Sequence, residues 1–239
     1  MRHYARLNPA KVDDSFRSRA EVLELSDVGA QLGFAFSVLN ERGLLRDPNR
    51  LDPDNPVPLL TWPFLDYLES LELSTRRLLE LGAGNSTLWL QRRFAHVRSF
   101  ETSPEWVDRL SRSIAPNVDL VCVESSTLEA AEIEYRGEEL VLVDFAGRRT
   151  RFLHHFLSRL SAERPQAIVL DNADWYRQGA ATLARYGYRE IPFYGFKCGQ
   201  AFVSCTSLFV DPSRFALETK LAFHRPAYAR RMQNPWDEP

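Results

Sequence analysis

Between residues 59 and 212, short apolar runs alternate with segments whose apolar positions recur at helical spacing. The apolar runs predict strands near 77–81, 97–101, 118–123, 139–143, 167–170, 189–194 and 203–210. Strands that alternate with helices form parallel sheets covered on both faces. We therefore expect an α/β fold with a doubly wound, mainly parallel sheet of seven strands. The last two strands, joined by a glycine-rich loop, have no helix between them and should form an antiparallel pair at one edge.

The first 58 residues have a different pattern. Residues 20–39 carry apolar positions at helical spacing, interrupted by Gly29 and Gly33, which predicts one helix or two. Residues 47–58 are rich in proline and asparagine and predict a loop. We expect an N-terminal helical cap with this loop over 1–58, an α/β domain over 59–212 and a C-terminal tail over 213–239.

Composition limits the possible partners and compartment. A net charge of −2 over 239 residues provides no electrostatic case for binding nucleic acid. No apolar segment is long enough to cross a membrane, and the N-terminus lacks the apolar core of a signal peptide. The cysteines Cys122, Cys198 and Cys205 are odd in number and lack C-x-x-C spacing. We expect a cytoplasmic protein that binds neither nucleic acid nor a membrane.

Two predicted strands end in features that suit a small ligand. The strand at 77–81 contains Glu80 and runs into a turn with Gly82 and Gly84, after which 85–87 begin a helix. The next strand ends at Glu101. Carboxyl ends of parallel strands meet at one sheet edge, where glycines admit a ligand and a helix N-terminus offers free N–H groups. We therefore predict a nucleoside site between the glycine turn and Glu101.

The glycine spacing argues against a dinucleotide. Thr87 stands where a dinucleotide fingerprint has its third glycine. A carboxylate at Glu80 would repel a pyrophosphate but would suit an ammonium group. S-adenosylmethionine carries an ammonium, a carboxylate and a nucleoside, and it fits these residues better. An NAD(P)-dependent oxidoreductase remains an alternative.

The segment Glu80-Leu-Gly-Ala-Gly-Asn-Ser-Thr87 resembles motif I of class I S-adenosylmethionine-dependent methyltransferases. Glu101 resembles the ribose-binding acid of that family, and the resemblance covers roughly residues 60–210. It implies a Rossmann-like methyltransferase fold. It also implies an enzyme that transfers a methyl group from S-adenosylmethionine.

The resemblance implies a role for each matching position. Gly82 and Gly84 would admit the methionine part, and Glu80 would hold its amino group directly or through water. Glu101 would bind both ribose hydroxyls, and Asp144 would face the sulfonium and the acceptor as the catalytic group. The remaining expected cofactor-binding residues are Asn85, Ser86 and Thr87 at the helix start and Ser125 and Ser126 beside the adenine.

A second group of polar residues raises the question of a metal. Asp144, Asp171 and Asn172 follow neighbouring predicted strands, and their oxygens are hard ligands that suit Mg²⁺. The arrangement resembles the metal site of catechol-type O-methyltransferases. That family also implies a lysine base, yet residues 145–149 contain none, and the only lysines are Lys11, Lys197 and Lys220. A metal-free site, with Asp171 and Asn172 capping a helix, is the favoured reading, and a magnesium site stays an alternative.

The sequence thus predicts a methyltransferase that acts on a small-molecule acceptor. Three alternatives stay open beside it: a Mg-dependent catechol-type O-methyltransferase, a non-catalytic nucleoside-binding or scaffold protein, and an NAD(P)-dependent oxidoreductase. The C-terminal tail is a candidate for contacts between subunits, so a homodimer is possible.

Overall fold

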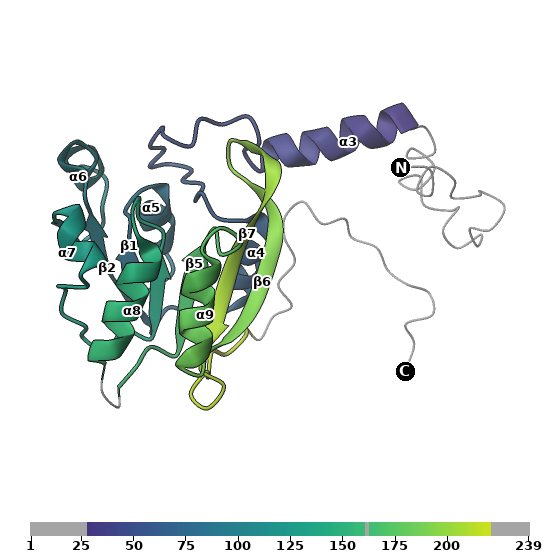
Figure 1. Cartoon of the computed structure of the whole chain (residues 1–239). Coiled ribbons are helices and arrows are strands. Elements are labelled where there is room, and N and C mark those ends of the chain that lie inside the picture. Colours follow the sequence, from purple (N-terminus) through teal and green to yellow (C-terminus); the bar gives the residue numbers. More distant parts are fainter. Residues whose placement is uncertain (1–27, 161–162, 221–239) are drawn as a thin grey trace. The chain divides into compact units, whose positions relative to one another are not determined.

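The computed structural model describes residues 28–160 and 163–220 (Figure 1). Residues 43–224 form one compact unit that contains the whole sheet. Helix α3 (Val28–Glu41) belongs to the other unit and runs without a break through Gly29 and Gly33. For the described part of the pattern expected over 20–39, the structure has one continuous helix over 28–41. The rest of the predicted cap before residue 28, and the tail beyond residue 220, lie outside the described residues.

The sheet has seven strands in the order β3-β2-β1-β4-β5-β7-β6. Strands β1 to β5 are parallel, and β7 runs antiparallel to both β5 and β6. This order confirms the expected doubly wound, mainly parallel α/β sheet with an antiparallel pair at one edge. The strands are β1 (Arg77–Leu81), β2 (His96–Glu101), β3 (Val118–Cys122), β4 (Leu140–Val143), β5 (Ala167–Asp171), β6 (Arg189–Lys197) and β7 (Gln200–Val210).

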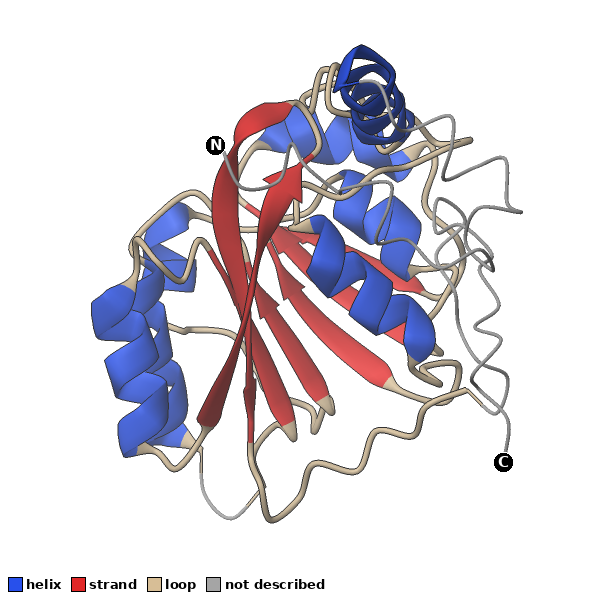
Figure 2. Cartoon of the chain, turned by 90° about the vertical axis from the view of Figure 1, so that its right-hand side faces the viewer, coloured by secondary structure: helices blue, strands red, loops and turns tan. Residues whose placement is uncertain are grey.

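Helices cover both faces of this sheet (Figure 2). Helices α8 and α9 pack side by side on one face, and α4 and α5 lie on the other (Figures 1 and 2). The helices of the compact unit are α4 (Trp62–Ser70), α5 (Asn85–Leu90), α6 (Pro104–Ser111), α7 (Ser125–Glu129), α8 (Arg149–Arg159) and α9 (Arg177–Arg185). None of the described helices has the length and apolar character that crossing a bilayer requires.

The core explains why the central strands read as nearly continuous apolar runs. Every residue of β4 and β5 is buried, as expected for strands with a helical layer on each face. Phe152 and Phe156 of α8 stack with ring centroids 5.1 Å apart and pack on this part of the sheet. Burial of such side chains provides the main stabilisation of the fold. It also holds the carboxyl ends of β1, β4 and β5 in fixed positions.

The predicted glycine-rich loop between the last two strands is wrong. β6 continues to Lys197 and β7 begins at Gln200, so a tight turn at 198–199 replaces the loop. Gly199 has a φ of +68°, a backbone conformation that glycine adopts without a Cβ penalty. The ladder shifts register between Gly195 and Lys197, so the glycine that looked like a loop residue marks a bulge inside a strand.

The proline-rich segment 47–58 lies inside the compact unit, so the boundary expected at residue 58 falls within that unit. The N–H of Gly199 donates to the carbonyl of Gly43 at 2.9 Å. Arg46, directly before the segment, donates to the Asn55 carbonyl within it at 3.0 Å and pairs with Asp52 at 3.4 Å. The segment is thus attached to the tip of the β6–β7 hairpin.

Replacement of Gly199 tests this attachment. A Cβ there would lie 2.6 Å from both the Arg46 carbonyl oxygen and Pro48 Cδ. Gly187 provides a matched control, because its φ is +91° but a Cβ would meet nothing within 4 Å. We expect both alanine variants to lose about 1–2 kcal/mol from backbone strain. Gly199→Ala should lose a further ~1–3 kcal/mol from overpacking, measured by urea unfolding. Equal losses in the two variants would show that the segment does not press on the hairpin.

Candidate active site

The glycine turn connects the ends of β1 and β4. Gly82 has a φ of +98°, and a Cβ there would lie 2.7 Å from the backbone oxygen of Asp144. The N–H of Asp144 donates to the Leu81 carbonyl at 2.9 Å. Only glycine permits this approach, since any side chain would push the two strand ends apart. The turn therefore places residues 82–84 directly beside Asp144.

The turn also meets Glu101. The Ala83 N–H donates to one carboxylate oxygen of Glu101 at 3.0 Å. The other oxygen accepts from the N–H groups of Thr102 at 2.7 Å and Ser103 at 2.9 Å. The two features that the sequence placed in one site thus lie in contact. A carboxylate has about four acceptor positions, so the partly exposed Glu101 keeps capacity for a hydroxyl group of a ligand.

Glu80 points into the fold. Its carboxylate has no exposed surface and accepts from the hydroxyls of Ser86 at 2.6 Å, Thr87 at 2.6 Å and Ser99 at 2.7 Å. Burial raises the pKa of Glu80 to about 7, against the lowering effect of these three hydroxyls, and the Glu101 carboxylate adds to the rise. The contact with a ligand amino group that the resemblance implies, direct or through water, stays a prediction. In the structure, hydroxyl groups occupy the carboxylate.

The start of α5 holds the turn and the proline-rich segment together. Thr87 Oγ1 accepts from the Gly84 N–H at 2.9 Å while it donates to Glu80. Asn85 Nδ2 donates to the Arg50 carbonyl at 2.9 Å, and its Oδ1 accepts from the Asp52 N–H at 3.0 Å. The amide expected to contact a cofactor is thus used to hold segment 47–58 against the site.

Trp106 is a site residue that the sequence pattern did not reveal. Its indole N–H donates to the Ala83 carbonyl at 2.6 Å, and a Cβ on Gly84 would lie 3.5 Å from the same nitrogen. The ring belongs to α6, whose first turn is capped by the Ser103 hydroxyl accepting from the Trp106 N–H at 3.2 Å. Trp106 therefore forms a wall beside the glycine turn.

Ser125 and Ser126 lie at the start of α7 and are exposed. The preceding backbone is tied to the candidate site, because the Val123 N–H donates to the Glu101 carbonyl at 2.9 Å. These hydroxyls thus lie at the start of the helix that follows β3, the strand paired with the end of β2 at Glu101. Their part in binding an adenine stays a prediction.

A second cluster of charges lies at the ends of β4 and β5. All three guanidinium nitrogens of Arg149 are engaged: with the Asp144 carboxylate at 2.8 Å, the Asp171 carbonyl at 2.7 Å and the Phe145 carbonyl at 2.8 Å. Burial, followed by the neighbouring Asp171 carboxylate, raises the pKa of Asp144, while Arg149 and then Lys197 oppose the rise. A carboxyl tuned toward neutral pH is suited to proton exchange.

Asp171 is enclosed by its own partners. Lys197 from the end of β6 donates to one oxygen at 2.5 Å, and Thr206 from β7 donates to the other at 2.6 Å. Asn172 has a φ of +54°. With its amide oxygen toward the Lys197 ammonium (3.2 Å), its nitrogen donates to Asp171 at 2.7 Å. The opposite orientation would point the amide hydrogens at a cation. No lysine follows Asp144 in the sequence, but Lys197, at the end of β6, lies beside Asp171 in this cluster.

The candidate metal ligands at the ends of β4 and β5 do not fit a magnesium ion. The Asp144 and Asp171 carboxylates are paired with Arg149 and Lys197, and a divalent cation would have to displace both. No group of three or more His, Cys, Asp or Glu side chains in the described part of the chain is arranged to hold a metal. The catechol-type alternative, with Asp144, Asp171 and Asn172 as ligands, is therefore not supported.

Comparisons with known proteins give structural neighbours only. No protein-family model matches the chain, and no curated protein matches it. A precorrin-6y C5,15-methyltransferase of Geobacter metallireducens has a TM-score of 0.48 and 16% identity, over 68% of this chain and 100% of that one. An AdoMet-bound TYW2 of M. jannaschii has a TM-score of 0.43 and 14% identity, over 62% of this chain and 73% of that one. A putative O-methyltransferase of Klebsiella pneumoniae has a TM-score of 0.46 and 15% identity, over 64% of this chain and 83% of that one.

The pH dependence of stability tests the environment of Glu80. Its pKa rises from 4.5 to about 7 on folding, so between these values the folded state keeps a proton that the unfolded state has released. Stability of the natural protein should therefore fall as pH rises through this window. Glu80→Gln has no proton to lose. Its stability relative to the natural protein should increase by up to about 3 kcal/mol between about pH 5 and pH 8 in urea unfolding. A constant difference would contradict the raised pKa.

Removal of the Lys197 ammonium tests the second cluster. Lys197→Met would leave the buried Asp171 carboxylate with the Thr206 hydroxyl, the Asn172 amide and, at 4.0 Å, Arg149. Breaking one side of a buried ion pair costs about 3–5 kcal/mol. Lys197→Met with Asp171→Asn should recover much of that loss. The exposed Lys220 is the matched control, and Lys220→Met should cost below ~1 kcal/mol. Similar losses in both single variants would contradict the pairing described above.

Proposed function

We propose that this chain is an enzyme that transfers a methyl group from S-adenosylmethionine to a small-molecule acceptor. One observation carries the proposal: the N–H of Ala83, between the two glycines, is hydrogen-bonded to Glu101 at 3.0 Å. The contact lies at the carboxyl edge of two neighbouring central strands, where ligands of doubly wound sheets bind. The resemblance of residues 80–87 to motif I supports the assignment.

Glu101 is proposed to accept hydrogen bonds from the ribose hydroxyls. Backbone N–H groups of Ala83, Thr102 and Ser103 hold its carboxylate in place, so no side-chain reorganisation is needed on binding. Gly82 and Gly84 would let the methionine part approach the backbone beside Trp106. Ser125 and Ser126 are proposed neighbours of the adenine.

Glu80 is proposed to act through the residues that it holds. Its carboxylate fixes the hydroxyls of Ser86 and Thr87, and Thr87 in turn accepts from the Gly84 N–H at 2.9 Å. This network sets the conformation of the turn and the start of α5.

The same network disfavours an NAD(P) site. In a dinucleotide fingerprint the third glycine allows close packing of helix and strand around a pyrophosphate. Here Thr87 is completely buried at that position, with its hydroxyl shared between Glu80 and the turn. The observation supports a nucleoside ligand without a pyrophosphate.

Asp144 is proposed to act on the acceptor side. When bound, S-adenosylmethionine supplies an electrophilic methyl group on its sulfonium. Asp144 lies against the backbone of Gly82, and burial raises its pKa, so its carboxylate can take a proton from a hydroxyl or amine of the acceptor. Arg149 fixes the side chain through a hydrogen bond of 2.8 Å. The chain's contribution is thus positioning and proton acceptance, without a covalent intermediate on the protein.

A compact acceptor is favoured over a polymer. The net charge is −2, which gives no general attraction for nucleic acid. Asn85 holds segment 47–58 beside the glycine turn through hydrogen bonds to both its amide atoms. That segment narrows the approach to the site from the side of α5.

Calorimetric titration with S-adenosylhomocysteine tests the proposal. Glu101→Gln cannot accept the same N–H groups or pair with both ribose hydroxyls, so affinity should fall about 10–100-fold. The control is Glu105→Gln, because Glu105 is an exposed acid of α6. It should bind as the natural protein does. NADH should show no saturable binding. Unchanged affinity in Glu101→Gln, or tighter binding of NADH, would refute the assignment.

A further inference from the structure

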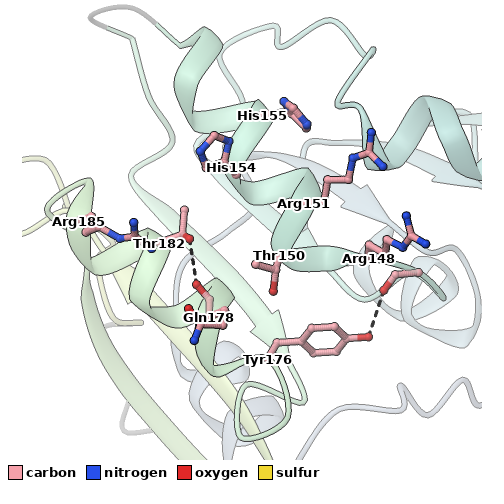
Figure 3. Close-up of a pocket in the computed structure, with 10 residues that line it drawn as sticks. Arg148, Thr150, Arg151, His154, His155, Tyr176, Gln178, Thr182 and Arg185 are labelled. Carbon is pink, nitrogen blue, oxygen red and sulfur yellow. Dashed lines mark hydrogen bonds between the residues drawn. The ribbon is translucent and has the colours of Figure 1, made fainter.

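A groove separates helices α8 and α9 on the face of the sheet that they cover (Figure 3). Its volume is about 610 Å³, within the usual range for sites that bind small molecules. The lining residues come from both helices and from the chain just before each of them: Gly147, Arg148, Thr150, Arg151, His154, His155, Tyr176, Gln178, Thr182 and Arg185. None of them is an acid.

The groove carries an excess of positive charge. Arg148 and Arg151 come from the α8 side, and Arg185 comes from the α9 side (Figure 3). A single carboxylate, Glu129, lies between the first two, 3.8 Å from Arg148 and 4.0 Å from Arg151. Arg185 donates to the Ala181 carbonyl at 3.3 Å and pairs with no acid in the described part of the chain. The three groove arginines thus have one carboxylate near two of them, and the third has none among the described residues.

Hydroxyl groups line the floor of this groove. Thr150 of α8 and Thr182 of α9 lie between the arginines (Figure 3). The close approach of the two helices at this level depends on Gly179, where a Cβ would lie 3.3 Å from Thr150 Oγ1 and 3.2 Å from Leu153 Cδ1. Thr182 donates to the Gln178 carbonyl at 2.9 Å, so its oxygen can still accept. Polar groups are therefore present at the depth that a ligand would reach.

The groove is separate from the candidate active site. Arg149 lies between Arg148 and Arg151 in sequence, but its guanidinium points to the ends of β4 and β5. Tyr176 closes the boundary, with its hydroxyl donating to the Gly147 carbonyl at 3.2 Å. The Arg149 guanidinium lies 5.0 Å from the centre of the Tyr176 ring. The mechanism proposed for methyl transfer therefore uses none of the three groove arginines.

We propose that the groove between α8 and α9 is a binding site for a small phosphorylated molecule. Planar guanidinium groups form paired hydrogen bonds with phosphate oxygens, and the groove has arginines from both helices. The groove volume matches a ligand of nucleotide size. The site is independent of S-adenosylmethionine and goes beyond the proposed methyl transfer.

Pyrophosphate is the probe for this site, titrated into the full chain by calorimetry at low salt. Arg151→Gln and Arg185→Gln should each weaken binding about tenfold, because each removes charge-assisted hydrogen bonds. Arg112→Gln is the matched control: the Arg112 side chain, directly after α6, is 74% exposed and pairs with Asp108 at 2.7 Å, away from the groove. It should bind pyrophosphate as the natural protein does. Added salt should weaken binding in the natural protein.

Several outcomes would overturn the proposal. One is the absence of saturable pyrophosphate binding, and another is an equal loss in all three arginine variants. A third is a short single-stranded RNA that binds more tightly than pyrophosphate and is weakened by the same two substitutions, because the ligand would then be a nucleic acid. S-adenosylhomocysteine titrated into the same samples separates this proposal from the previous one. The groove variants should bind S-adenosylhomocysteine with the same affinity as the natural protein.

Discussion

The contact between Gly82 and the backbone of Asp144 is the constraint on which the candidate site depends. A Cβ at position 82 would lie 2.7 Å from the Asp144 carbonyl oxygen, so the ends of β1 and β4 can meet only around a glycine. The turn then brings the Ala83 N–H to Glu101 at the end of β2. One residue in a left-handed conformation therefore joins the expected nucleoside side of the site to the expected acceptor side.

Four acidic side chains lie near this sheet edge, and each has a different set of hydrogen-bond or ion-pair partners. Glu80 is buried among hydroxyls and has a raised pKa, while Asp171 is paired with Lys197. Asp144 is held by Arg149, and Glu101 is held by three backbone N–H groups with the Thr102 hydroxyl at 3.4 Å. This difference explains the proposed division of roles. Of the two acids without a cation partner among the described contacts, Glu80 is fully buried and Glu101 is partly exposed, so Glu101 is the one assigned to ligand hydroxyls. The acid held by arginine is assigned to proton acceptance.

Most of the fold was predictable because it depends on local pattern. Apolar runs alternating with helical segments require a sheet covered on two faces, and the structure has it. The error at the β6–β7 hairpin arose because Gly195 and Gly199 look alike in sequence. One lies at a bulge inside a strand and the other forms the turn. The convergence of the glycine turn and Glu101 was also predictable, since parallel strands end at one edge.

The sequence by itself determined the strand pattern, the glycine turn and the acids that follow the strands, because these depend on residues close together in the chain. Only the tertiary structure decided what each acid faces. Lys197 reaches Asp171 from a distant strand, and Trp106 reaches the turn from α6. Asn85 is engaged by segment 47–58. The groove between α8 and α9 likewise exists only once both helices pack on the sheet. Such contacts are set by how layers pack, and no local spacing encodes them.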